Sequence, residues 1–172
     1  MIRSGVTALK AALLIISFLF LSACATTLAP SYDQAVVDGL QSTSQKLMQF
    51  FASTTSGTTS GTARASFDDR QVTYDNIIGS LDALVIQARA RPIPKNAVTE
   101  RVNAALEKRG VRALEGDDAP SASAMQEISK TMVKMRDTDR KQGVTPLEVL
   151  AFRNQVEIYL DQAITYETYL ER

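Results

Sequence analysis

The residues of this chain best suited to acid–base chemistry are two pairs of adjacent carboxylates. Asp68 and Asp69 form one pair, and Asp117 and Asp118 form the other. Two carboxylates that face one substrate can act as general acid and general base. Neighbouring residues of a helix point about 100° apart, however, so neither pair would converge on a single substrate atom. We therefore expect no catalysis at either pair.

The chain contains no histidine. This removes the usual general base, the usual metal ligand and every Ser-His or Cys-His nucleophile. Haem and di-iron bundles need histidine, and the methionines lack a second type of copper ligand. The glycines within residues 53–62 are not followed by the Gly-Lys-Ser/Thr of a phosphate-binding loop. The sequence therefore predicts a protein that is not an enzyme and has no metal site or cofactor.

Cys24 is the only cysteine, and it lies at the edge of an apolar run. Arg3 and Lys10 are the only charged residues before it, residues 11–21 are almost entirely apolar, and small residues follow. This order is typical of a secretory signal peptide. The run is shorter than the roughly 20 apolar residues of a spanning helix, so an uncleaved membrane helix is the less favoured alternative. A buried free thiol or an intermolecular disulfide is likewise less favoured for Cys24.

Residues 21–24, Leu-Ser-Ala-Cys, resemble the lipobox of bacterial lipoproteins, the class processed by signal peptidase II. The resemblance implies that a diacylglycerol is attached to the sulfur of Cys24, that the signal peptide of residues 1–23 is removed, and that the new N-terminus is acylated. Two or three acyl chains make a lasting membrane anchor. Ala25 stands where an aspartate would favour the inner membrane. The resemblance thus implies an outer-membrane lipoprotein that faces the periplasm.

Removal of 23 residues from the 172-residue chain would leave 149. We expect the lipidated cysteine and a short tether at residues 24–30 and one domain at residues 31–172. The six residues after Cys24 reach about 20 Å at most, which keeps the domain near the membrane surface. Without Arg3 and Lys10, 17 basic residues face 19 acidic ones, a net charge of −2. This balance offers no electrostatic case for a nucleic-acid partner.

Apolar residues recur at steps of three and four, without the alternation of strands. The pattern predicts an all-α fold, an antiparallel bundle of four long helices plus one short helix at residues 96–109. Ser31 with Gln34, and Thr145 with Glu148, are typical of helix starts. The expected core positions are Val36, Leu40, Thr43, Leu47 and Phe50; Tyr74, Ile77, Leu81, Leu84 and Ala88; Met125, Ile128, Met132 and Met135; and Val149, Phe152, Val156, Tyr159, Ala163, Tyr166 and Leu170.

Two groups of residues are candidates for binding. Arg89, Arg91 and Lys95 cluster near the end of the second helix, which an up-down bundle would return toward the membrane. There they could contact anionic headgroups, or they could only complement the helix dipole. The last helix has apolar residues off its main seam, Ile158 and Ile164 among them. Either this helix is central and contacts several neighbours, or it exposes an apolar strip that docks a partner or a second copy.

The expected function is that of a membrane-anchored periplasmic lipoprotein, a non-enzymatic interaction or structural module of the cell envelope. Its partners would be the membrane, through the lipid, and an envelope protein or a second copy. The alternative is a sensor or carrier that holds an apolar small molecule between the helices near Tyr74, Tyr159 and Tyr166. A carrier needs a cavity of about 300 Å³ or more, whereas an interaction module can be solidly packed. The regular seams favour the interaction module.

Overall fold

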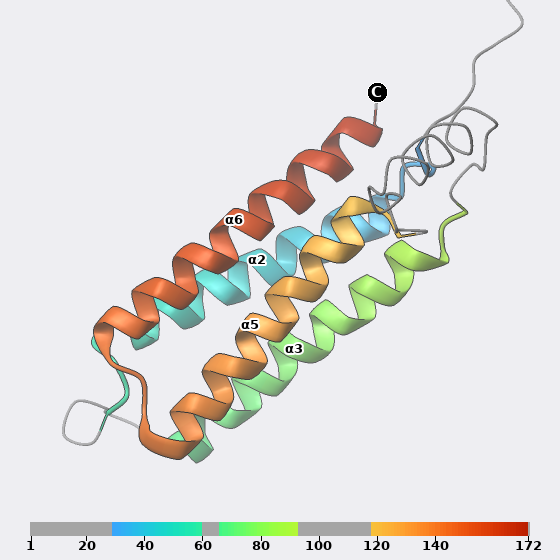
Figure 1. The fold of residues 1–172 in the computed structure, drawn as a ribbon. Helices are drawn as coiled ribbons and strands as arrows, with labels where there is room; N and C mark the ends of the chain where they lie inside the picture. Colours follow the sequence, from blue (N-terminus) through green and yellow to red (C-terminus); the bar gives the residue numbers. More distant parts are fainter. Residues whose placement is uncertain (1–28, 60–65, 93–117, 172) are drawn as a thin grey trace, which may run out of the picture.

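The computed structural model describes residues 29–59, 66–92 and 118–171. Within these ranges it consists of four α-helices without strands: α2 (Gln34–Thr54), α3 (Phe67–Ala90), α5 (Pro120–Gln142) and α6 (Pro146–Leu170). Successive helices run in opposite directions (Figure 1). The all-α class and the packing of four long helices are confirmed. The expected short helix at residues 96–109 lies outside the described residues.

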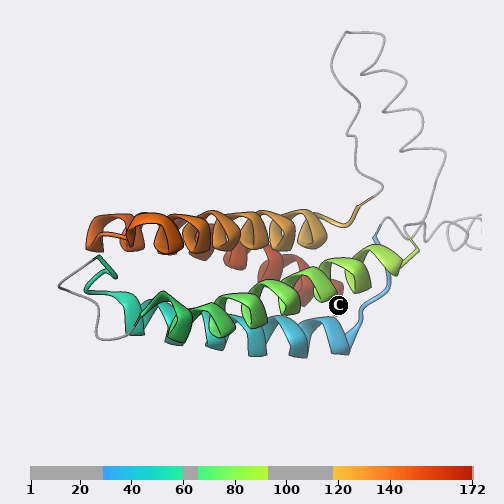
Figure 2. The same ribbon diagram turned by 90° about the horizontal axis from the view of Figure 1, so that it is seen from below.

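The four helices form a closed ring in which α3 and α6 each pack against both α2 and α5. Seen from below, α2 and α3 lie side by side beneath α5 (Figure 2). We call the end with the start of α2, the end of α3, the start of α5 and the end of α6 the proximal end, because the chain enters the bundle there. The opposite end, with the connection from α5 to α6, is the distal end.

Helix starts follow the sequence with one exception. The backbone N–H of Thr145 donates to the Glu148 carboxylate at 2.8 Å, as the capping pattern predicts. The N–H of Ser66 donates in the same way to Asp69 at 2.9 Å, so this candidate carboxylate serves as a cap partner. The expected cap at Ser31 is wrong, because Asp33 accepts the N–H of Ala35 at 2.9 Å instead. Its carboxylate also suits the positive end of a helix dipole.

The core lies along the predicted seams of α2, α3 and α5. Every expected position on these three helices is buried. Tyr74 is fully buried, with its ring edge-on to Phe50 at a centroid distance of 4.5 Å and stacked near Phe67 at 6.3 Å. Four methionine and isoleucine positions on α5 are likewise fully buried and fill the centre. Periodicity was sufficient for α2 and α5 because each has one clear apolar face, and it also held for α3, although Val72 and Ile86 lie exposed off its buried face.

The predicted seam of α6 is only partly right. Val149, Val156 and Ala163 are buried, but the aromatic positions between them are partly buried. Leu160 and Glu167 occupy core positions instead. Apolar residues lie on several faces of this helix, so the spacing was compatible with more than one rotation of the helix about its axis. Packing against α2 and α5 decides between them.

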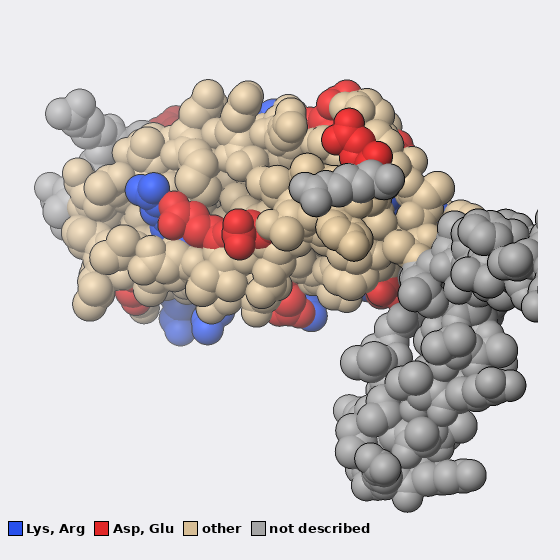
Figure 3. Space-filling view, turned by 90° about the horizontal axis from the view of Figure 1, so that it is seen from above, with Lys and Arg blue, Asp and Glu red and all other residues tan. Residues whose placement is uncertain are grey.

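The outward side of α6 is exposed and apolar. Leu147, Leu150, Ile158 and Tyr169 lie on it, with exposed fractions of 75%, 52%, 54% and 68%, and we call these four residues the α6 outer face. Figure 3 looks onto this side of the bundle, which is mostly uncharged but has a row of basic and acidic side chains across it. Of the two alternatives for α6, a central helix does not fit these four exposed side chains, although Leu160, which also lies off the predicted seam, is buried. None of the helices in the described ranges is long and apolar enough to cross a membrane.

Candidate functional site

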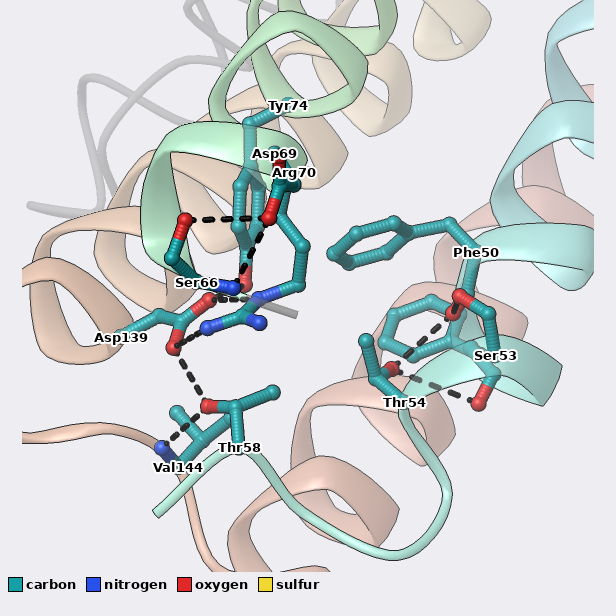
Figure 4. Close-up of polar contacts among 11 residues, drawn as sticks. Phe50, Ser53, Thr54, Thr58, Ser66, Asp69, Arg70, Tyr74, Asp139 and Val144 are labelled. Atoms are coloured by element: carbon teal, nitrogen blue, oxygen red, sulfur yellow. Dashed lines mark hydrogen bonds and ion pairs between the residues drawn. The ribbon is translucent and has the colours of Figure 1, made fainter. Parts of the chain in front are cut away.

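The distal end contains a buried carboxylate that accepts hydrogen bonds from three side chains (Figure 4). Asp139 of α5 has a fully buried side chain. Arg70 of α3 donates to it from Nε at 2.8 Å and from Nη2 at 2.9 Å. The hydroxyl groups of Thr58 and Tyr74 donate to the same carboxylate, the latter at 3.3 Å. This bidentate pair with two added hydroxyls is the distal cluster.

The distal cluster contains residue types that occur in active sites, but its carboxylate is not accessible to a substrate. Asp139 has no surface in contact with solvent, and each of its oxygens already accepts hydrogen bonds. Burial, followed by the nearby Asp139 charge, raises the pKa of the Tyr74 hydroxyl, which therefore stays protonated as a donor. No substrate can reach the carboxylate without displacing its partners. The arrangement supports a structural role.

The distal cluster also holds the chain that follows α2. The N–H of Thr58 donates to the carbonyl of Val144 at 2.7 Å, and the N–H of Val144 donates to the Thr58 hydroxyl at 2.9 Å. Gly57 and Gly143 allow this close crossing, with φ of 79° and 76°. A Cβ at Gly57 would lie 2.7 Å from the Val144 carbonyl oxygen. Both glycines are therefore required by backbone geometry.

The proximal end contains a second buried pair, the proximal cluster. Arg91 donates from Nη1 to one oxygen of Glu167 at 2.7 Å and from Nη2 to the other at 2.5 Å. The two side chains are only 6% and 1% exposed. The hydroxyl of Ser121 donates to Glu167, and Arg91 reaches the backbone carbonyl of Ser31 at 3.5 Å. Hydrogen bonding to Glu167 raises the pKa of Arg91, which stays charged.

The proximal cluster overturns part of the headgroup prediction. Arg91 is buried in an ion pair, so it is not available to a membrane surface. Arg89 pairs with Asp118 at 2.8 Å and donates to Gln126 at 3.0 Å. Lys95, the third member of that group, lies outside the described residues. The sequence identified the cations but not their carboxylate partners, which come from α6 and from the start of α5.

The candidate carboxylate pairs do not form a common site. Asp69 caps its own helix, Asp118 pairs with Arg89, and Asp117 lies outside the described residues. Across the described residues, no group of three or more cysteine, aspartate or glutamate side chains is placed to hold a metal ion. The carboxylates that are most enclosed, Asp139 and Glu167, were missed.

A signal for the two missed carboxylates is present in the sequence. Asp139 continues the series of buried positions on α5, four residues after Met135. Glu167 follows Ala163 by four residues on α6. An acidic residue at a core position implies a buried partner, because an unpaired charge is too costly to bury. The spacing alone does not identify which arginine supplies that partner.

The two apolar candidates on α6 are both accessible. Ile158 is 54% exposed on the α6 outer face, and Ile164 is 38% exposed at its flank. The α6 outer face, to which Ile158 belongs, is an apolar strip from Leu147 to Ile158 that is interrupted by Asp161, Gln162 and Thr165 before Tyr169 at the proximal end. Such strips on a well-packed domain mark surfaces that bind other molecules. This strip is the candidate functional site.

The three tyrosines of the carrier interpretation do not meet around a cavity. Tyr74 packs near the distal end, whereas Tyr166 lines a groove with Pro120 at the proximal end. That groove has a volume of about 470 Å³ and is open to solvent. Two further open grooves, of about 620 and 550 Å³, lie along α5 and between α2 and α3. None of these three hollows brings Tyr74 and Tyr166 together.

No family model, curated protein or solved structure matches this chain.

Proposed function

We propose that this protein is a lipid-anchored envelope lipoprotein that acts as a non-enzymatic docking module, with the α6 outer face as its partner surface. The lipobox-like sequence before Cys24 supports the anchor. The exposed apolar strip on α6 is the single observation that carries the docking role. Its expected partner is an envelope protein with a complementary apolar surface.

The exposed side chains on α6 suit docking better than catalysis. Leu147 and Ile158 present branched apolar surface without an adjacent catalytic group, and each is more than half exposed. The buried charged residues among those described are instead enclosed in the two clusters at the ends of the bundle. Interfaces of this kind depend on a few apolar or aromatic side chains that become fully buried on binding.

The anchor is tested by metabolic labelling with a fatty-acid analogue in a host that processes lipoproteins. The wild-type chain should take up label, and Cys24→Ser should remain unlabelled and uncleaved at this site. Label retained by the Cys24→Ser protein would contradict the lipid attachment.

The docking surface is tested with a photo-crosslinking residue at position 158 in intact cells. We expect a discrete crosslinked partner, which Ile158→Lys or Ile164→Lys should weaken by about tenfold or more in a purified binding assay. Ile86→Lys is the matched control, because Ile86 is 68% exposed on α3 and lies off α6. All these variants should retain the helical circular dichroism of the wild type. Equal loss with Ile86→Lys, or a crosslink only between copies of this chain, would contradict the proposed partner surface.

A further inference from the structure

The path of the chain limits how far the bundle can lie from a membrane. The described residues begin at Ala29, five residues after Cys24. A fully extended chain of that length spans about 18 Å at most. If the apolar residues 11–21 hold the chain instead of lipid on Cys24, eight residues separate Leu21 from Ala29 and the limit is about 29 Å.

The start of the described chain lies against the proximal end. Pro30 is buried, and the carbonyl of Ser31 accepts a hydrogen bond from Arg91 at 3.5 Å. Arg91 is held in turn by Glu167, near the end of α6. The tether therefore leaves the bundle beside the last turn of α6, and this end of the molecule is the one nearest to the membrane.

A groove with two tyrosines and one carboxylate in its walls opens at this same end. It is lined by Pro120, Asp161, Gln162, Thr165, Tyr166 and Tyr169. Tyr169 is 68% exposed, so much of its ring is available for contact. Tyrosine combines an apolar ring with a polar hydroxyl, which suits the boundary between headgroups and acyl chains. The groove is thus chemically matched to a lipid surface.

The charged residues that the structure describes at the proximal end offer no attraction to anionic headgroups. Its two described arginines, Arg89 and Arg91, are engaged with Asp118 and Glu167. The nearby exposed or half-buried charges on α2 and α6 are acidic: Asp33, Asp38, Asp161 and Glu171. A contact made here must depend on the aromatic and apolar groups, and zwitterionic phospholipid fits them better than anionic phospholipid.

We propose that the proximal end rests on the bilayer and that the groove beside Tyr166 and Tyr169 takes the headgroup–acyl boundary of zwitterionic phospholipid. The proposal builds on the membrane attachment in the proposed function and adds the surface that touches the lipid. It also orients the α6 outer face relative to the membrane. The 25 residues of α6 rise about 37 Å, which carries Leu147 away from the membrane toward a partner.

Two single-cysteine variants test this orientation. Thr165→Cys and Leu147→Cys are five helical turns apart on the same exposed side of α6, about 27 Å along its axis. Because Cys24 is the only natural cysteine, each variant offers one new thiol for an environment-sensitive fluorophore. The full-length protein is reconstituted in phosphatidylcholine vesicles that contain nitroxide lipids. Unsubstituted protein gives the background label at Cys24.

We expect nitroxide quenching at position 165 that exceeds quenching at 147 at least fivefold, with little change as salt rises. Adding Tyr169→Ser should reduce the quenching at 165. Equal quenching at both positions would mean that α6 lies flat on the bilayer, and it would overturn the proposal. Blue-shifted emission at 165 without quenching would mean that protein, a second copy included, covers the groove, which also overturns it.

Failure of this proposal is distinguishable from failure of the anchor. Absence of quenching at both positions, in protein that remains with the vesicles, overturns the lipid contact and leaves the lipoprotein assignment unchanged. Absence of fatty-acid label at Cys24 overturns the lipid anchor. The quenching pattern still decides the contact in that case, since the apolar residues 11–21 would keep the proximal end within about 29 Å of the membrane.

Discussion

The two ends of the bundle each bury an arginine–carboxylate pair, but they satisfy the carboxylate differently. At the distal end Asp139 accepts hydrogen bonds from Thr58 and Tyr74 in addition to Arg70. At the proximal end Glu167 has Ser121 as its other side-chain donor besides Arg91. The arginine therefore supplies a larger share of the hydrogen bonds to the carboxylate at the proximal end than at the distal end.

Both clusters also bind the chain on either side of α2. The distal cluster holds Thr58, just after α2, and the proximal cluster reaches Ser31, just before it. The remaining partners come from α3, α5 and α6. Buried polar groups of this kind need specific partners, so they favour one arrangement of packed elements over others. We infer that the two clusters fix α2 in place from its two ends.

The largest expected effect is at the proximal pair. Arg91→Ala leaves the Glu167 carboxylate buried with only a hydroxyl donor, which should cost about 3 to 5 kcal/mol of unfolding free energy. Arg70→Ala leaves Asp139 with two hydroxyl donors, beside a groove that admits water, and should cost about 1 to 3 kcal/mol. Urea denaturation of residues 29–172 measures both. A larger loss at Arg70 would reverse the comparison between the ends.

Replacing both members of the proximal pair sharpens the same comparison. Arg91→Met with Glu167→Leu removes the buried charges together, so the double variant should recover most of the stability lost in Arg91→Ala. It should also lose the link to Ser31, which hydrogen exchange at the start of α2 can detect as faster opening. If the double variant is as unstable as the single one, the pair contributes more than its charges.

Alanine substitutions at two glycines, Gly57 at the distal end and Gly79 in the middle of α3, test whether backbone conformation requires glycine at the distal crossing. Gly57→Ala should cost about 1 to 3 kcal/mol, because φ is 79° and the new Cβ would lie 2.7 Å from a carbonyl oxygen. Gly79→Ala, in the exposed middle of α3 with nothing within 4 Å, should instead stabilise by about 0.5 to 1 kcal/mol. Thermal unfolding distinguishes the two signs. Equal effects would remove the case for a required crossing at Gly57.

The smallest expected effect concerns pH at the distal start of α6. Hydrogen bonds from the backbone N–H and then the hydroxyl of Thr145 lower the pKa of Glu148. Because the folded pKa is the lower one, the stabilisation is complete above the unfolded value of about 4.3 and is lost as pH falls through the folded value. Glu148→Ala should therefore cost less than about 1 kcal/mol at pH 7 and almost nothing near pH 2. A cost that stays constant with pH would contradict a role for the charged carboxylate.

Helix type and most of the core were predictable from local pattern. Thr145 and Glu148 marked the start of α6, and the spacing of apolar residues marked the buried positions of α2, α3 and α5. The seam of α6 was predicted only in part. Leu160 is buried and Phe152 is only partly buried, because apolar residues on several faces left the rotation of this helix undetermined.

Several residues of the candidate site could be identified from the sequence, but their exposure and their partners could not. Ile158 and Ile164 were identified off the predicted seam, and they are exposed because α6 packs against α2 and α5 only and turns its remaining side to solvent. Arg91 was identified as a cation at a helix end, but its burial depends on Glu167, 76 residues later in the chain. Long-range partners of this kind have no local signature.

The sequence by itself determined the apolar segment before Cys24, the helical periodicity and the capping residues, since each depends on groups a few positions apart. Only the tertiary structure decided which carboxylate meets which arginine, which side of α6 remains exposed, and which end of the bundle lies beside the tether. These features depend on how four helices rotate and pack together. That choice is made by the summed burial and hydrogen bonding of residues far apart in the chain.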